Sequence, residues 1–153
     1  MGSYRTIVVG TDGSESSFVA VDRAAAVAQA TGAKLLIACA YTPIDERTRN
    51  RASRELGEET YKVTGSHPAE DLLRDADARA RKAGATDVTT RSEQGDPVET
   101  LVRVIKDAGA DLVVVGNRGL NSLAGRLLGS VPANISHRAS CDVLIVHTTD
   151  GGR

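Results

Sequence analysis

Short runs of apolar and β-branched residues alternate along this chain with longer segments of helical periodicity, and this alternation limits the folds that the chain can adopt. The runs that we interpret as strands are residues 4–10, 34–41, 87–93, 111–116 and 142–148. Strands interleaved with helices form a parallel sheet that is covered on both faces, with right-handed crossovers. We therefore expect an α/β fold, a single doubly wound five-stranded parallel sheet in the order 3-2-1-4-5 with helices on both faces.

The helix expected over residues 97–108 has the clearest boundaries. Asp96 is placed to cap it, Pro97 takes its first position, and Glu99 completes an Asp-x-x-Glu capping box. Gly109 follows the last periodic residue and predicts its end. Further helices are expected over residues 16–30, 67–83 and 130–139.

Length and composition indicate one globular domain over residues 1–149, followed by a disordered tail at 150–153. Residues 42–65 are polar and carry dense charge of both signs, which favours a surface loop, with a mobile cover over a site as the alternative. The formal net charge is −1, so nucleic acid and anionic membrane surfaces are not expected partners. Cys39 and Cys141 lie in apolar runs, where we expect small buried residues in a reducing cytoplasm.

Several catalytic classes lack their sequence signatures. The chain has neither a G-x-x-x-x-G-K-[ST] P-loop nor a G-x-G-x-x-G after the first strand. Its Cys and His residues do not cluster at metal-ligand spacing, and no Ser-His-Asp pairing is visible. We therefore assign no catalytic residue.

Two segments are expected to meet at the point where the strand order reverses. Ligands of doubly wound sheets bind there, beyond the carboxyl ends of the strands. "GTDGS" follows the first strand, and "GNRGLNSLAGRLLGSV" follows the fourth. The second segment is rich in glycine, which serves either turn geometry or the close approach of a ligand.

The glycine-rich segment suits an anion. Gly116 and Gly119 can turn backbone N–H groups inward, and Gly129 with Ser130 opens a helix whose first N–H groups favour phosphate. Ser130 either caps that helix or touches the ligand, and a flexible connection is the alternative role of the glycines. Arg118 is placed to screen phosphate charge.

The side of the site across from the glycines is formed by the first two strands. Asp12 can accept ribose hydroxyls or hold Mg²⁺ through the nucleotide, and an Asx-turn is its structural alternative. Ala38 and Ala40 end the second strand with small side chains, which leaves room for a flat ring and for backbone hydrogen bonds to an adenine edge.

These residues resemble the universal stress protein family. "GNRGLNSLAGRLLGS" fits its G-x2-G-x9-G-[ST] motif, and "TIVVGTDGSESS" and "CDVLIVH" are similar to its first and last strands. The resemblance spans essentially the whole chain and implies an adenine-nucleotide-binding homodimer that pairs through its last strand, residues 143–146. The resemblance assigns Asp12 to ribose or metal, Ala40 to the adenine, Gly116, Gly119, Gly129 and Ser130 to ribose and phosphates, and a backbone contact to Val131. The whole predicted nucleotide site comprises Gly10, Thr11, Asp12, Ala38, Ala40, Gly116, Asn117, Arg118, Gly119, Gly129, Ser130 and Val131.

One position departs from the family pattern. Two residues after the motif serine, nucleotide-binding members often carry Ser or Thr, whereas this chain has Pro132, which has neither an N–H nor a hydroxyl. We therefore predict a preference for ligands with fewer phosphates than ATP, such as AMP or cyclic AMP.

The expected function is that of a stress or signalling sensor that binds ATP, AMP or cyclic AMP without fast catalysis. The alternative is a slow Mg²⁺-dependent ATPase or nucleotide hydrolase, in which Asp12 helps to place the metal and a water. A flavodoxin-like carrier is disfavoured by the scarcity of aromatic residues, which make up 3% of the chain. A receiver domain is disfavoured because "DVLIVH" lacks the required lysine.

Overall fold

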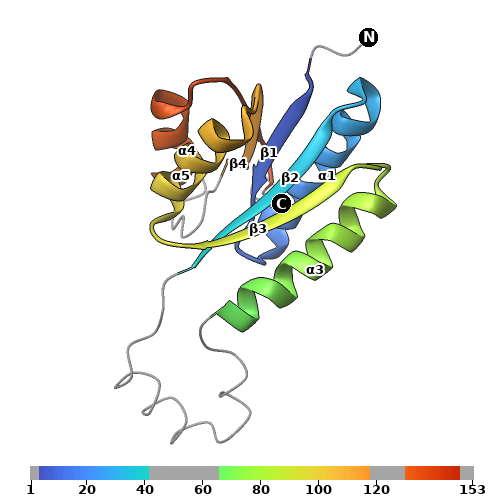
Figure 1. Ribbon diagram of the computed structural model, residues 1–153, viewed down its shortest axis with the longest axis horizontal. Coiled ribbons are helices and arrows are strands. Elements are labelled where there is room, and N and C mark those ends of the chain that lie inside the picture. Colours follow the sequence, from blue (N-terminus) through green and yellow to red (C-terminus); the bar gives the residue numbers. More distant parts are fainter. Residues whose placement is uncertain (1–3, 42–65, 118–129, 149–153) are drawn as a thin grey trace, which may run out of the picture.

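The computed structural model describes residues 4–41, 66–117 and 130–148 as one parallel sheet with helices on both faces (Figure 1). The strands are β1 (Thr6–Gly10), β2 (Lys34–Tyr41), β3 (Val88–Gln94), β4 (Leu112–Gly116) and β5 (Asp142–Val146). The helices are α1 (Glu15–Thr31), α3 (Ser66–Lys82), α4 (Pro97–Ala108) and α5 (Ser130–Arg138). The strand order β3-β2-β1-β4-β5 confirms the predicted doubly wound fold. The predicted excursion at 42–65 and the tail at 150–153 lie outside the described residues.

The two faces of the sheet have separate cores, because successive side chains of a strand point to opposite faces. Ile7 and Val9 of β1 pack with α1 and α3 on one face. Val8, between them, packs with α4 and α5 on the other. All three are fully buried, and each such side chain contributes about 1.5–3 kcal/mol through burial. Figure 1 shows the two helix pairs on opposite sides of the sheet.

The boundaries of α4 follow from its capping residues. The Asp96 side chain accepts a hydrogen bond from the Glu99 N–H, and Gly109 ends the helix with φ +64°. The predicted capping box is only half formed, because the Glu99 carboxylate pairs with Arg138 of α5 instead of returning to the N-cap. That ion pair joins α4 to α5 across one face of the sheet.

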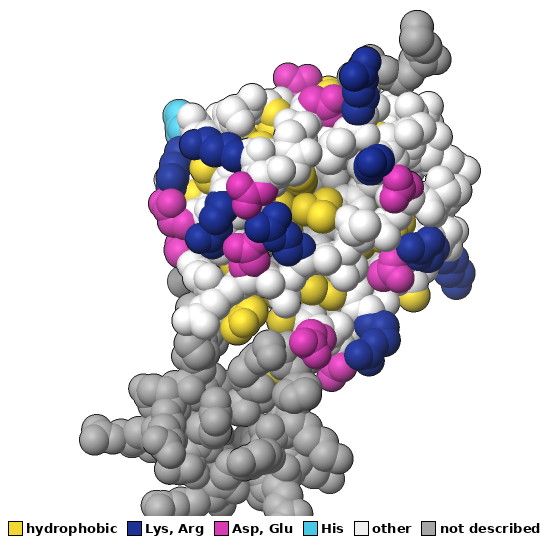
Figure 2. Space-filling model, viewed as in Figure 1, with side chains coloured by type: hydrophobic (Ala, Val, Ile, Leu, Met, Phe, Trp, Pro, Cys, Tyr) yellow, Lys and Arg dark blue, Asp and Glu magenta, His cyan; other side chains and the backbone are white. Residues whose placement is uncertain are grey.

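The two edge strands differ in chemistry. β3 is polar, as predicted for an edge, and its Arg91 and Glu93 form ion pairs with Asp107 and Arg103 of α4. Figure 2 shows basic and acidic side chains interspersed on the face that includes this edge. At the opposite edge, residues 143–145 of β5 are apolar and only partly buried. No helix among the described residues is long and apolar enough to cross a membrane.

Candidate functional site

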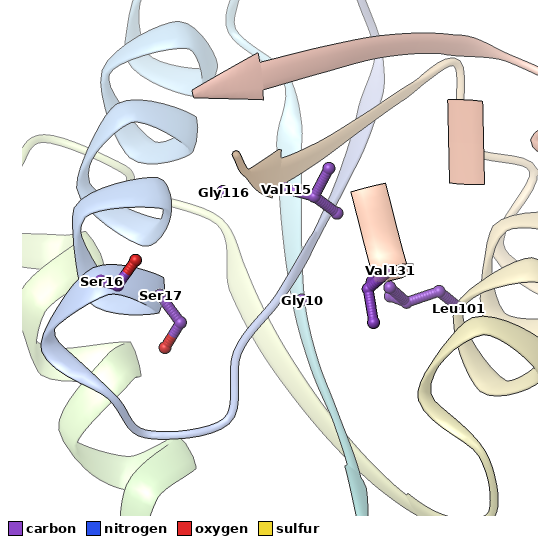
Figure 3. Close-up of a pocket in the computed structure, with 7 residues that line it drawn as sticks. All are labelled: Gly10, Ser16, Ser17, Leu101, Val115, Gly116 and Val131. Atoms are coloured by element: carbon purple, nitrogen blue, oxygen red, sulfur yellow. The ribbon is translucent and has the colours of Figure 1, made fainter. Parts of the chain in front are cut away.

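Two adjoining hollows lie at the carboxyl ends of the central strands. The Gly116 hollow is lined by Gly10, Ser16, Ser17, Leu101, Val115, Gly116 and Val131 (Figure 3). The Ala40 hollow is lined by Gly10, Thr11, Ala38, Ala40, Pro97, Thr100 and Leu101. Because Gly10 and Leu101 line both, the two hollows form one elongated site at the switch point between β1 and β4.

Glycine at two strand ends permits close approach of neighbouring side chains. A Cβ atom on Gly10 would lie 3.1 Å from Leu101 Cδ1, and one on Gly116 would lie 3.0 Å from Thr148 Cγ2. Both distances are shorter than ordinary van der Waals contacts, so a larger residue would displace the side chain opposite it. These glycines therefore set the shape of the site.

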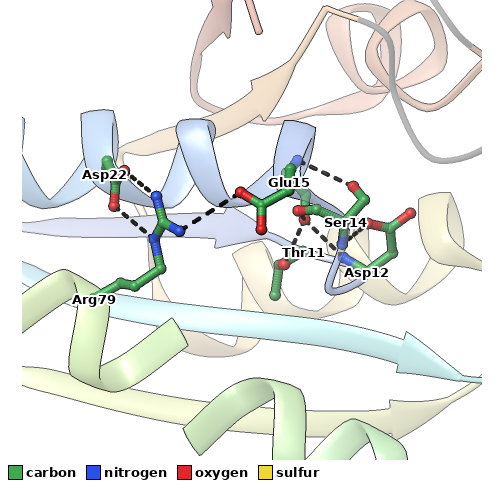
Figure 4. Close-up of polar contacts among 7 residues, drawn as sticks. Thr11, Asp12, Ser14, Glu15, Asp22 and Arg79 are labelled. Atoms are coloured by element: carbon green, nitrogen blue, oxygen red, sulfur yellow. Dashed lines mark hydrogen bonds and ion pairs between the residues drawn. The ribbon is translucent and has the colours of Figure 1, made fainter. Parts of the chain in front are cut away.

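The turn between β1 and α1 is held by its own polar side chains (Figure 4). Asp12 Oδ1 accepts a hydrogen bond from the Ser14 N–H at 2.9 Å, and Ser14 Oγ accepts one from the Ser17 N–H at 3.1 Å. The buried Thr11 hydroxyl lies 2.7 Å from Ser17 Oγ and accepts from the Gly13 N–H. One Asp12 oxygen thus forms the Asx-turn that was its structural alternative. Its other oxygen has no hydrogen-bond partner within the ranges that the structure describes.

Cys39 lies near this turn, and its thiol has low reactivity. Burial, together with the negative charge of Asp12, raises the pKa of its thiol to about 11. A thiol with that pKa is almost fully protonated at neutral pH and is a poor nucleophile. Both cysteines are free, and Cys141 is less buried than Cys39.

A second polar cluster joins the ends of β4 and β5 to the start of α1. Asn117 Oδ1 accepts hydrogen bonds from Thr148 N at 2.8 Å and from Thr148 Oγ1 at 3.1 Å. Thr148 Oγ1 lies 2.5 Å from Ser16 Oγ. The Asn117 N–H donates to Val146 O at 2.7 Å, which extends the β4–β5 pairing by one residue. This cluster connects the outer strand to the lining of the Gly116 hollow.

The predicted site residues fall into three groups. Those that line the hollows are Gly10, Thr11, Ala38, Ala40, Gly116 and Val131. Asp12 and Asn117 belong to the adjacent turns rather than to the lining. Arg118, Gly119 and Gly129 lie outside the described residues, and of Ser130 the structure describes only its place as the first residue of α5.

The Ala38 backbone has less capacity for a ligand than the sequence suggested. Its carbonyl oxygen accepts a hydrogen bond from Thr11 N at 3.0 Å, and its side chain is 2% exposed. Ala40, two residues further along β2, is half-buried and also lines the hollow. Ala40 is therefore the better placed of the two for an adenine edge.

Several lining residues were not predicted from the sequence. Ser16 and Ser17 follow "GTDG" directly, so their place in the first turn of α1 was the available signal. Leu101 is typical of a core residue of α4 and also lines both hollows. The others are Pro97, Thr100 and Val115.

The described lining holds no charged side chain. Its polar members are hydroxyls and backbone groups, and the carboxylate of Asp12, which follows the lining residue Thr11, is exposed. Within the described residues, no group of three or more His, Cys, Asp or Glu side chains is placed to hold a metal ion. The arrangement suits a ligand with an apolar flat part and several hydrogen-bonding groups.

Comparisons of this chain with a family model and with known proteins identify the same family. A model of the universal stress protein family matches residues 3–147. Universal stress protein Rv1636 of Mycobacterium tuberculosis is 57% identical over 149 residues, which cover 97% of this chain and 100% of that protein.

Solved structures agree in fold. A universal stress protein crystallised in complex with cAMP has 49% sequence identity and a TM-score of 0.73, covering 95% of this chain and 98% of that one. Universal stress protein UspA from Lactobacillus plantarum has a TM-score of 0.76 at 24% identity, covering 95% of this chain and 99% of that one. At that lower identity the similarity bears on the fold alone.

Proposed function

We propose that this chain, which belongs to the universal stress protein family, binds an adenine nucleotide in the elongated site between β1 and β4. The observation that carries the proposal is the pair of hollows joined through Gly10 and Leu101. The Ala40 hollow has the apolar walls that a purine ring needs, and the Gly116 hollow offers hydroxyls and the start of α5 to a ribose and phosphate. A relative with 49% identity has been crystallised with cAMP, which supports the same ligand class here.

The adenine is assigned to Ala40 and the ribose and phosphate to the residues after β4 and at the start of α5. Ala40 backbone groups would meet the base, and Asp12 would approach the ribose or a nucleotide-bound Mg²⁺ with its second oxygen. Gly116, Val131 and the residues of the glycine motif would hold the phosphate. Helix N-termini attract such groups through their unpaired N–H groups and dipole.

Pro132 favours ligands with fewer phosphates. It is the third residue of α5, so the first turn of this helix has one N–H fewer than usual for a polyphosphate. We expect AMP or cyclic AMP to bind at least as tightly as ATP. Tighter binding of ATP than of both would contradict this argument from Pro132.

Binding without fast turnover fits the described lining better than catalysis. General-base catalysis of phosphate transfer needs a carboxylate, imidazole or amine within hydrogen-bond reach of the attacking water. The described lining consists of glycine, apolar and hydroxyl residues. The alternative, a slow Mg²⁺-dependent ATPase, is tested by single-turnover phosphate release, in which stoichiometric release within minutes would favour the enzyme.

The function is tested by isothermal titration calorimetry of the full chain with ATP, AMP and cyclic AMP, each with and without Mg²⁺. Mass spectrometry of the purified protein identifies any nucleotide that it carries. We expect saturable binding of a monophosphate. Absence of binding by all three nucleotides, in protein shown to carry none, would refute the function.

We further propose that two copies pair through β5, at residues 143–146. This edge presents partly buried apolar side chains, whereas the β3 edge is polar and ion-paired. Analytical ultracentrifugation should give a dimer that Leu144→Lys weakens at least about tenfold, since a charge would enter the paired edge. Thr90→Lys, on β3, is the matched control and should leave the dimer intact. A cytoplasmic location is proposed on the two free thiols, which fit a reducing compartment.

A further inference from the structure

Two adjacent serines line the Gly116 hollow, and only one of them has hydrogen-bonding capacity left for a ligand. The Ser17 hydroxyl donates to Ser14 O at 2.9 Å and receives the Asp12 N–H at 3.4 Å. It also lies 2.7 Å from Thr11 Oγ1. A hydroxyl has one proton and two lone pairs, so these three contacts use all of its capacity. Ser17, which is 5% exposed, therefore serves the turn itself.

Ser16 differs because its hydroxyl has one contact within the described residues, Thr148 Oγ1 at 2.5 Å. Its side chain is partly exposed and belongs to the lining of the hollow. Figure 3 shows Ser16 on α1, across the hollow from Val131 of α5.

The direction of the hydrogen bonds around Ser16 is fixed by Asn117. The Thr148 N–H donates to Asn117 Oδ1 at 2.8 Å, which assigns this atom as the amide oxygen, an acceptor only. The Thr148 hydroxyl also donates to it, at 3.1 Å, and so spends its single proton. Either hydroxyl could donate in the contact between Ser16 and Thr148, and with the Thr148 proton directed to Asn117 this donor is Ser16.

Ser16 Oγ consequently faces the hollow as an acceptor. Its proton is directed to Thr148, and its remaining lone pairs are open to a ligand that brings a donor. An ionised phosphate has no proton to donate, whereas a sugar hydroxyl does. Both AMP and cyclic AMP carry a ribose 2′-hydroxyl, and in cyclic AMP it is the sole free hydroxyl of the sugar.

We propose that Ser16 is a specificity-determining residue that accepts a hydrogen bond from the ribose 2′-hydroxyl, and that Thr148 and Asn117 position it as an acceptor. The proposal rests on the adenine-nucleotide function proposed above. It adds a contact between α1 and the sugar, controlled from the end of β5.

The test compares the affinities of AMP, 2′-deoxy-AMP and 3′-deoxy-AMP for the full chain by isothermal titration calorimetry. We expect the wild-type protein to bind 2′-deoxy-AMP about tenfold more weakly than AMP, because the Ser16 oxygen is left without its donor. The loss for 3′-deoxy-AMP should be smaller. In Ser16→Ala the penalty for 2′-deoxy-AMP should fall to about twofold or less.

Two variants of Thr148 test the positioning. Thr148→Val keeps the shape and the backbone N–H but removes the hydroxyl, so Ser16 loses the acceptor that orients its proton. In this variant we expect the loss of affinity for 2′-deoxy-AMP relative to AMP to become at least threefold smaller. This change is on the order of the contribution of one hydrogen bond. Thr148→Ser restores the hydroxyl and should restore the penalty, while thermal unfolding confirms that both variants fold.

The outcomes separate this proposal from the function itself. If AMP and cyclic AMP both fail to bind the wild-type protein, the proposed function fails and this inference with it. If AMP binds but the 2′-deoxy penalty is absent, or is the same in Ser16→Ala, the inference alone is overturned. A penalty confined to 3′-deoxy-AMP would overturn the assignment to the 2′-hydroxyl, and an unchanged penalty in Thr148→Val would overturn the positioning by Thr148.

Discussion

The two walls of the Gly116 hollow are built in different ways. The turn after β1 is closed on itself, with the hydroxyls of Thr11 and Ser17 bonded to groups a few residues away. The second wall depends on contacts between distant segments, in which Asn117 after β4, Thr148 after β5 and Ser16 of α1 meet. Substitutions in the first wall should therefore change stability, and substitutions in the second should change ligand binding.

The largest effect on ligand binding is expected from Gly116→Ala, in the second wall. The added Cβ would lie 3.0 Å from Thr148 Cγ2, so one of the two must shift at the edge of the hollow. We expect nucleotide binding about tenfold weaker, or ~1.4 kcal/mol, by isothermal titration calorimetry. The double variant Gly116→Ala/Thr148→Ser removes the opposing methyl group but keeps the hydroxyl, and should recover most of the affinity. Equal losses in the single and double variants would show that steric contact is not the cause.

Ser17→Ala tests the first wall. Its hydroxyl is buried and has three polar contacts, so its removal leaves Thr11 and Asp12 groups without a partner. We expect the free energy of unfolding in urea to fall by about 2 kcal/mol. Ser16→Ala is the matched control on the neighbouring residue and should cost about 0.5 kcal/mol or less, because Ser16 has one contact and is partly exposed. Equal losses would remove the distinction between the walls.

The rate of thiol labelling at Cys39 tests the environment of this side chain beside the first wall. Because burial and Asp12 raise the pKa of Cys39 to about 11, alkylation of the native protein at pH 8 should modify Cys39 at least about tenfold more slowly than Cys141. In Asp12→Asn the negative charge is lost, so the pKa of Cys39 should fall and its labelling should accelerate. Mass spectrometry of peptides separates the two sites, and faster labelling of Cys39 than of Cys141 would contradict this prediction.

The smallest effect concerns the ion pair that holds α5, the helix carrying Val131, to α4. Arg138 lowers the pKa of Glu99 below its usual value of 4.5. A lowered pKa adds stability above the unfolded-state pKa, and this stability is lost as the pH falls through the folded-state pKa. Glu99→Gln should therefore lower the melting temperature slightly at pH 7, with the difference disappearing below about pH 4. A difference that grows on acidification would contradict the assignment.

Local sequence features predicted most of the fold. Helical periodicity, the Asp96 cap and the glycine at position 109 defined α4 correctly. The continuous apolar runs of the first, second and fourth strands predicted β1, β2 and β4 as the inner strands of the sheet. The positions of Gly10 and Gly116 also followed, because ligand sites of doubly wound sheets lie at the carboxyl ends of these strands.

Contacts between residues far apart in the chain could not be predicted from the sequence. Ser16 and Thr148 are 132 positions apart, and no pattern in either segment indicates that their hydroxyls meet. Thr148 was expected in the last strand, but β5 ends at Val146 because the Thr148 N–H donates to the Asn117 side chain instead of to a ladder partner. Glu99 was likewise expected in a capping box and is drawn to Arg138, 39 positions away.

The most direct test of the central claim is a backbone-amide NMR titration of the full chain with AMP. A nucleotide in the proposed site should shift the amides of Gly10, Ser16, Gly116 and Val131, which line the Gly116 hollow on separate elements. The chemical shifts of the Thr89 and Thr90 amides, on the β3 edge, should not change. Shifts confined to the β3 edge, or saturating AMP without shifts at the four lining residues, would contradict the account.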